Sequence, residues 1–256
     1  MIGLPGDDVH LWLVFEAELD RDPPLDDDYR ALLTDEERAK ESRFYFARDR
    51  RRYLVTRALI RTVLSGYSGV EPRAWRFATN DYGRPHVAAP ADAPGTLSFN
   101  LAHTAGLIVC ACTGSGVVGV DAEHVERDRA PLDIADRYFS AAEVSELQAS
   151  PPEQRAERFF YYWTLKESYI KAIGTGLSTP LDRFSFNLAR PGAIGLSFHE
   201  GLSDDPRRWR CWLLEPARTH VVAVCAERAQ RVVVRKVVPL VGEQPCEYRT
   251  LAQSSG

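Results

Sequence analysis

Residues 159–173 read Phe-Phe-Tyr-Tyr-Trp-Thr-Leu-Lys-Glu-Ser-Tyr-Ile-Lys-Ala-Ile, and Gly174 follows them. As a helix with about 100° per residue, this stretch is apolar almost all round, which is typical of a buried helix. Its charged residues, Lys166, Glu167 and Lys171, fall within a sector of about 140°. Charges at the edge of an apolar helix need partners. A plain Glu167–Lys171 ion pair on a thin solvated stripe is one interpretation, and a functional cluster completed by other segments is the second.

A second chemical feature lies on the β-rich run Val117–Glu123. Side chains of a strand alternate between two faces, so Gly119, Asp121 and Glu123 share one face. The two acids are about 6.5 to 7 Å apart along the strand and can converge on one hard cation, beside a space that Gly119 leaves for a bulky ligand. Oxygen ligands of this type suit Mg²⁺ rather than zinc. A solvent-facing strand side with ordinary acids is the alternative.

Two further groups of polar residues need an explanation. His103 and Thr104 stand where a loop is expected to turn into the next strand, and such positions often carry binding groups. A structural role for His103 is the alternative. An arginine cluster consists of Arg48, Arg50, Arg51, Arg52, Arg57 and Arg61. Of these, Arg48, Arg50 and Arg51 are expected to be solvated or to meet an acidic partner.

Composition limits the class of protein. The 256 residues are 45% hydrophobic and 27% charged, with a formal net charge of −4. These values indicate a globular chain of one large or two smaller domains and argue against a general nucleic-acid binder. No apolar run approaches the roughly 20 residues needed to span a bilayer. Five cysteines without a zinc-type C-x-x-C pair fit a reducing compartment. A cytoplasmic protein is expected, without membrane or nucleic-acid partners.

Local patterns predict an α+β protein. Capping-box spacings at Thr34/Glu37 and Ser140/Glu143 start two helices, and a third helix is expected over residues 50–64. The runs 107–112 and 117–122, separated by Thr-Gly-Ser-Gly, predict a β-hairpin. Further strands are predicted at 9–15, 184–188, 210–215, 221–226 and 232–238.

In order and spacing, these residues resemble the 4′-phosphopantetheinyl transferases of the long, pseudo-dimeric, surfactin-synthetase-activating type. The strong part of the resemblance spans about residues 97–188, and a weaker part extends back through 82–85 and 40–52. It is carried by Phe99–Thr104, Gly119–Glu123, Ala135–Ser140 with Glu143, and Trp163–Ser168 with Lys171.

The resemblance implies a fold of two similar α/β lobes in one chain, related by pseudo-twofold symmetry. The N-terminal lobe is expected over residues 1–124 and the C-terminal lobe over 125–241. A polar tail, expected to be disordered, covers 242–256. The chain is expected to be a monomer.

The activity that the resemblance implies is transfer of 4′-phosphopantetheine from coenzyme A to a serine of an apo acyl or peptidyl carrier protein, with release of 3′,5′-ADP. Asp121, Glu123 and Glu167 would hold Mg²⁺, and Glu167 could also accept the serine proton. Lys171 would stabilise the leaving group. The expected substrate-binding residues are Lys40, Arg52, Arg84, His103, Thr104 and Lys166.

Within that set, Arg52 and Arg84 would hold the 3′-phosphate and adenine end of coenzyme A, and His103 and Lys166 would contact phosphate oxygens. Three positions depart from the family pattern. A hydroxyl residue is usual at Ala102, a small hydroxyl residue is also found at Tyr53, and a basic residue is frequent at Glu37, where Lys40 or Arg38 would take over its role. Two other functions stay open: a Mg²⁺-dependent nuclease or phosphodiesterase with the same three acids, and a non-catalytic module that binds coenzyme A.

Overall fold

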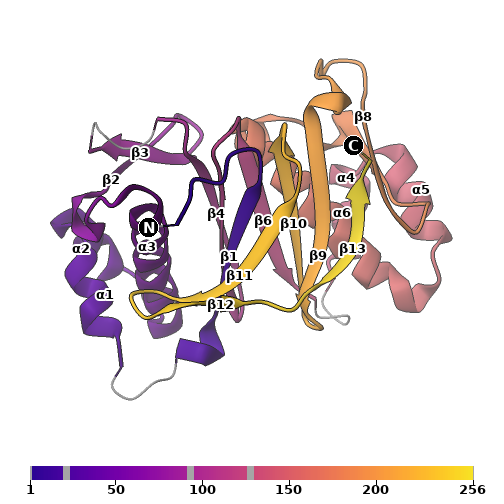
Figure 1. Cartoon of the computed structure of the whole chain (residues 1–256). Coiled ribbons are helices and arrows are strands. Elements are labelled where there is room, and N and C mark those ends of the chain that lie inside the picture. Colours follow the sequence, from indigo (N-terminus) through magenta and orange to yellow (C-terminus); the bar gives the residue numbers. More distant parts are fainter. Residues whose placement is uncertain (1, 20–23, 91–94, 126–129, 256) are drawn as a thin grey trace.

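The computed structural model describes residues 2–19, 24–90, 95–125 and 130–255. Figure 1 shows two lobes side by side, with their sheets facing each other in the middle and helices on the two outer sides. We call them the N lobe, which contains helices α1 to α3, and the C lobe, which contains α4 to α6. The layer order is therefore helix, sheet, sheet, helix.

The sheet of the N lobe has five strands. Along the sheet they are β12 (Gly242–Pro245), β11 (Val232–Val238), β1 (Val9–Phe15), β5 (Leu107–Thr113) and β4 (Ser98–Thr104). Strands β1 and β11 are parallel, and the other neighbours are antiparallel. The outer elements are α1 (Asp26–Leu32), α2 (Asp35–Glu41), α3 (Ala47–Ser68) and the hairpin of β2 (Arg76–Thr79) and β3 (Pro85–Ala89).

The sheet of the C lobe has six strands. In order they are β6 (Val118–His124), β10 (His220–Glu227), β9 (Trp209–Ala217), β13 (Arg249–Ser254), β8 (Gly192–Phe198) and β7 (Phe184–Asn187). Its helices are α4 (Ala135–Tyr138), α5 (Ala141–Ala149) and α6 (Pro152–Ile173). Short 3₁₀ turns are η1 (Glu16–Leu19), η2 (Pro72–Ala74), η4 (Leu132–Ile134), η5 (Gly176–Ser178), η6 (Leu181–Arg183) and η7 (Pro206–Arg208).

The side chains of β1 alternate between two buried faces, and one of these faces packs against the C lobe. On β1, Leu11 and Leu13 face the C lobe and pack in one apolar cluster with β6 and β10, whereas Trp12 and Val14 face the helices of the N lobe. Both faces of this central strand are therefore buried, which explains why residues 9–15 are apolar almost throughout. The shared cluster fixes β6 of the C lobe against the N lobe.

Several local predictions are confirmed. Both predicted capping boxes form, with the side chains of Thr34 and Ser140 accepting from the third helical amide. The central helix α6 ends at Gly174, whose left-handed backbone (φ 74°) stops the helix. No helix among the described residues is long and apolar enough to cross a membrane.

Other predictions are wrong, and strand pairing explains why. Strands β5 and β6 do not form a hairpin, because β5 pairs with β1 and β4 while β6 pairs with β10. The connection between them passes from one sheet to the other. The expected boundary at residue 124 is not where the sheets divide, since β6 belongs to the C-lobe sheet and β11 to the N-lobe sheet. The expected tail forms β12 and β13, and each pairs with a neighbouring strand.

Candidate active site

The site begins where α6 lies directly on β6. A Cβ atom added to Gly119 would be 2.0 Å from the carbonyl oxygen of Ser168 and 2.3 Å from the amide nitrogen of Ala172. The sequence-based interpretation, that Gly119 leaves room for a bulky ligand, is therefore wrong. The missing side chain leaves room for the backbone of α6, which brings Glu167 and Lys171 beside the acids of β6.

An ion pair forms the centre of the site. The Lys171 ammonium lies 2.6 Å from Oδ1 of Asp121, and Asp121 is only 6% exposed. Burial raises the pKa of Asp121, against the pull of Lys171. Burial alone would lower the pKa of Lys171, but Asp121, followed by Glu167 and Glu123, raises it above its ordinary value. Lys171 is therefore a fixed positive charge among three acids.

Carboxyl groups nevertheless outnumber ammonium groups here. The pKa of Glu123 is raised to about 7, first by burial, then by the Asp121 carboxylate and by Glu167. Lys171 and a hydrogen bond from the Trp163 side chain lower it in part. Burial and Asp121 likewise raise the pKa of Glu167 to about 7. Three carboxyl groups thus share one ammonium, and ionising all three is costly.

This cluster matches the chemistry of a hard cation site. Oδ2 of Asp121 is buried and has no hydrogen-bond partner among the described residues, which leaves one carboxylate oxygen free to coordinate. Carboxylate oxygens are the ligands that Mg²⁺ prefers. In the conformations described, no group of three or more His, Cys, Asp or Glu side chains is arranged to hold a metal ion. Mg²⁺ binding would therefore require side-chain movement by Glu123 or Glu167.

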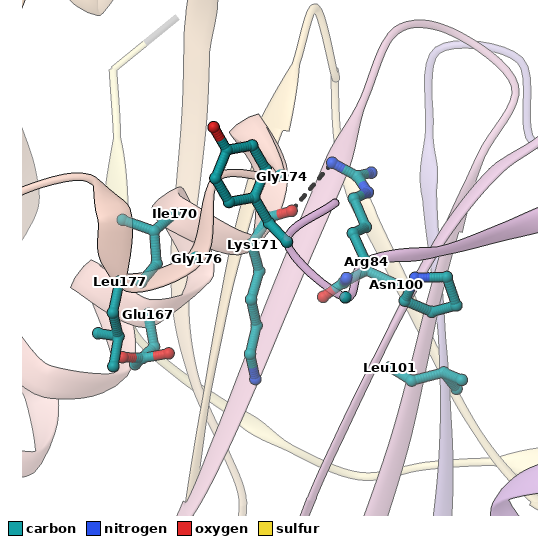
Figure 2. Close-up of a pocket in the computed structure, with 12 residues that line it drawn as sticks. Arg84, Asn100, Leu101, Glu167, Ile170, Lys171, Gly174, Gly176 and Leu177 are labelled. Carbon is teal, nitrogen blue, oxygen red and sulfur yellow. Dashed lines mark hydrogen bonds between the residues drawn. The ribbon is translucent and has the colours of Figure 1, made fainter. Parts of the chain in front are cut away.

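A pocket opens beside this cluster at the boundary of the lobes. Figure 2 shows its lining, to which α6 contributes Glu167 and Lys171, β4 contributes Asn100 and Leu101, and the β2–β3 turn contributes Arg84. The lining mixes these charged groups with apolar surface. Such a pocket can accept a ligand with charged and apolar parts.

Arg84 makes structural contacts in this pocket. Its guanidinium donates to the carbonyl oxygens of Lys171 (2.9 Å), Ala172 and Val118 (3.1 Å). Asn80 of the same turn donates to the Gly174 carbonyl at 2.9 Å. Figure 2 shows the first contact, with the Lys171 ammonium extending away from it. The N lobe therefore holds the carbonyl end of α6 with a cation, which also suits the negative end of the helix dipole.

The end of β4 brings three more predicted residues toward the site. The Thr104 hydroxyl accepts from the main-chain NH of His124 at 3.1 Å and ties β4 to β6. Partial burial, Arg52 and Lys171 all lower the pKa of His103, so both cations act on the imidazole. Arg52 itself is held by the Glu16 carboxylate, with Nε at 2.7 Å.

Comparisons with known proteins match both parts of the chain to one family. A family model described as "4′-phosphopantetheinyl transferase superfamily" matches residues 117–225, and one described as "4′-phosphopantetheinyl transferase, N-terminal" matches residues 24–115. A 4′-phosphopantetheinyl transferase of Bacillus subtilis is 38% identical over 176 residues, which cover 69% of this chain and 75% of the relative. The chain belongs to the 4′-phosphopantetheinyl transferases. It is an enzyme that transfers the phosphopantetheinyl group of coenzyme A to carrier proteins.

Two further similarities complete the comparison. The 4′-phosphopantetheinyl transferase Sfp of Bacillus subtilis strain 168 is 33% identical over 198 residues, covering 77% of this transferase and 84% of Sfp. The crystal structure of a holo-[acyl-carrier-protein] synthase from Thermotoga maritima gives a TM-score of 0.36 at 24% identity, over 44% of this transferase and 64% of that chain.

The structure does not bring two predicted residues into the cluster of this transferase. Lys166 is fully buried and lies 2.8 Å from Glu143, which is also fully buried, and it donates to the carbonyl oxygens of Leu181 and Phe184. Its three donors are therefore used inside the C lobe. Lys40 lies over the ring of Tyr53, 5.6 Å from its centroid, on the outer side of the N lobe.

Sequence reasoning missed three residues that hold these groups in place. They are Glu16, which binds Arg52, Glu143, which binds Lys166, and Asn100, whose Oδ1 accepts from the Val120 amide at 2.9 Å. Each acts on a segment far away in sequence. The capping-box spacing marked Glu143 as the third residue of a helix, but this pattern does not predict that Glu143 pairs with Lys166.

Proposed function

We propose that the transferase carries out its reaction at the cluster of Asp121, Glu123, Glu167 and Lys171, with Mg²⁺ as cofactor and 3′,5′-ADP as leaving product. The observation that supports this most is the excess of buried and half-buried carboxyl groups around one ammonium. The free Oδ2 of Asp121 and the raised pKa values of Glu123 and Glu167 all favour a divalent cation at this point. When bound, Mg²⁺ would neutralise charge on the pyrophosphate of coenzyme A.

The reaction breaks the pyrophosphate bond of coenzyme A. The serine oxygen of the carrier forms a bond to the phosphorus next to pantetheine, the bridging oxygen leaves with 3′,5′-ADP, and the serine proton is taken up. Glu167 suits this last role, because a carboxylate whose pKa is about 7 accepts a proton well near neutral pH. Lys171 keeps its charge and can stabilise the leaving phosphate.

Binding of the nucleotide is assigned to the neighbouring residues. We propose that Arg52, His103 and Thr104 contact the phosphates of coenzyme A, with Arg52 at the 3′-phosphate. Their place at the end of β4 and on α3, next to Lys171, supports this assignment. For Arg84 we propose contact with the nucleotide through its Nε edge and its aliphatic stem in the pocket wall, since its terminal nitrogens hold main-chain carbonyl oxygens of α6 and β6.

The proposal extends to the oligomeric state and the cellular location of the enzyme. Both lobes that frame the cluster come from one chain, so a monomer should be active. All five cysteines are free, and four of them are buried, which is compatible with the expected cytoplasmic location.

The direct test uses coenzyme A, Mg²⁺ and a panel of apo carrier domains, with the products weighed by mass spectrometry. We expect each accepted carrier to gain one phosphopantetheinyl group for every 3′,5′-ADP released, and chelation of Mg²⁺ to stop the reaction. Hydrolysis of a plain phosphodiester, with all carriers unmodified, would favour the nuclease alternative. Unmodified carriers with no turnover of any phosphoester would favour a binding module.

A further inference from the structure

Glu16 connects two segments of the N lobe that face the site. It is the first residue after β1 and begins the turn η1. Its carboxylate accepts three hydrogen bonds, from Nε of Arg52 at 2.7 Å, from Nη2 of Arg52 at 3.0 Å and from the amide of Gly106 at 3.0 Å. Its own amide donates to the Gly106 carbonyl at 3.0 Å. Glu16 therefore binds α3 and the β4–β5 turn at once.

The pair with Arg52 determines how that arginine points. A carboxylate that meets the Nε and Nη2 edge of a guanidinium fixes the plane of the group. The side chains of Arg52 and Glu16 are only 17% and 29% exposed, so the pair is largely shielded from water. Nη1 stays outside this fork and lies 3.8 Å from Asp49. Among the described residues Nη1 has no hydrogen-bond partner, so we take it as the nitrogen of Arg52 that meets a ligand.

The contact with Gly106 extends the effect of Glu16 to His103. Gly106 has a left-handed backbone (φ 82°) in the turn that follows His103 and Thr104. His220 of the C lobe holds the same turn from the other side, with Nε2 2.8 Å from the Ala105 carbonyl oxygen. The charges of Arg52 and Glu16 both act on His103: Arg52 lowers its pKa and Glu16 raises it. Glu16 is thus bonded both to Arg52 and to the turn that follows His103.

We propose that Glu16 is a positioning residue for nucleotide recognition: it orients Arg52 and the His103 turn, and thereby sets the preference for coenzyme A over dephospho-coenzyme A. This inference rests on the proposed placement of the 3′-phosphate at Arg52. The opposite role, in which the carboxylate on Arg52 competes with an incoming phosphate, is an outcome of the test. The two roles predict opposite changes when the carboxylate is removed.

The test compares Glu16→Gln with Glu18→Gln. Glu18 lies on the same turn η1 and pairs with Lys236 at 2.9 Å on the exposed surface, so it is a matched control. A glutamine at position 16 keeps the shape but has one acceptor oxygen, and its NH₂ group would face the donor of Arg52 or Gly106. Glu16→Asp keeps the charge, but its shorter side chain cannot reach all three donors, and it serves if Glu16→Gln folds poorly.

The measurement is kcat/KM for coenzyme A and for dephospho-coenzyme A at saturating carrier protein. Wild type should prefer coenzyme A by about tenfold or more, and Glu16→Gln should reduce that preference about fivefold, since one charge-assisted bond becomes misaligned. Activity on the dephospho compound and the Mg²⁺ dependence should stay within about twofold of wild type. Glu16→Asp should lie between the two, and Glu18→Gln should match wild type.

Several results would overturn the inference. Tighter coenzyme A binding by Glu16→Gln would make Glu16 a competitor of the phosphate, and equal losses on both compounds would make its role structural. A wild-type preference that Arg52→Ala removes but Glu16→Gln leaves intact would reject this inference and keep the proposed 3′-phosphate placement. A wild-type enzyme without any preference would reject both.

Discussion

The substitution Gly119→Ala tests whether the close approach of α6 to β6 builds the active site. The new Cβ would be 2.0 Å from the Ser168 carbonyl oxygen and 2.3 Å from the Ala172 amide, and both atoms are main chain of α6. Neither can rotate away. Ordinary contact begins at 3.4 Å, so the helix and strand would have to separate by about 1.4 Å.

That separation acts on the catalytic pair as well as on packing. Lys171 on α6 and Asp121 on β6 are 2.6 Å apart, and a shift of about 1.4 Å would bring them near 4 Å, the outer limit of an ion pair. Misplacement of catalytic groups by about 1 Å can cost about 100-fold in rate. Overpacking of a filled site costs about 1–3 kcal/mol in the free energy of unfolding. We therefore expect a folded, moderately destabilised enzyme with kcat/KM lowered about 100-fold.

The assay is the initial rate of carrier modification, together with thermal unfolding of the same samples. Gly195→Ala is the matched control, because Gly195 also lies on a C-lobe strand but its new Cβ would meet Asn187 at 3.3 Å (Cβ) and 3.9 Å (carbonyl oxygen), without a clash as short as that at Gly119. That control should keep wild-type activity. If Gly119→Ala also kept wild-type kcat/KM, the close approach of α6 to β6 would not determine the catalytic geometry.

Three other outcomes are expected. Glu167→Gln should lower kcat about 100-fold with coenzyme A affinity little changed, and complete rescue by Mn²⁺ in rate assays would leave Glu167 only a metal-binding role. In metal-free protein, the folded state retains protons on Glu123 and Glu167 up to about pH 7 that the unfolded chain loses near pH 4.5. The stability that these two groups contribute should therefore be fully present below about pH 4.5 and lost as pH rises through 7, as calorimetry can measure, and saturating Mg²⁺ should abolish this loss. Lys166→Met should lower the free energy of unfolding by about 3–5 kcal/mol, because it leaves the buried Glu143 carboxylate without its ion-pair partner. The KM for coenzyme A of the folded variant should stay near wild type. A raised KM without destabilisation would instead indicate that Lys166 binds coenzyme A.

The sequence predicted the elements that carry the chemistry better than it predicted their partners. Helix α6 and its end at Gly174 follow from apolar periodicity and one glycine, and the shared face of Asp121 and Glu123 follows from strand alternation. Such local rules do not say which strands pair. The run 107–122 reads as a hairpin, yet its two strands enter different sheets because each buries both of its faces.

The same limit explains the errors among the site residues. A helical wheel places Lys166 in one sector with Glu167, but it cannot show that the buried Glu143 of α5 forms an ion pair with Lys166. Strand β4 contains Asn100, a poor strand former, and its place in the N-lobe sheet is set by tertiary contacts with β5 and β6. Arg84 looks like a free phosphate ligand until its carbonyl partners on α6 are known.

The central claim is that the carboxylates between β6 and α6 hold Mg²⁺ against coenzyme A. Isothermal titration of Mg²⁺ into the enzyme saturated with coenzyme A, without carrier protein, tests it most directly, with wild type and Asp121→Asn compared and coenzyme A alone as the blank. Asparagine keeps the shape and can still accept from Lys171, so the variant should fold. We predict one Mg²⁺ per wild-type chain and binding weakened at least about tenfold in Asp121→Asn. Equal Mg²⁺ affinity in the two proteins would contradict the assignment of this cluster as the metal site.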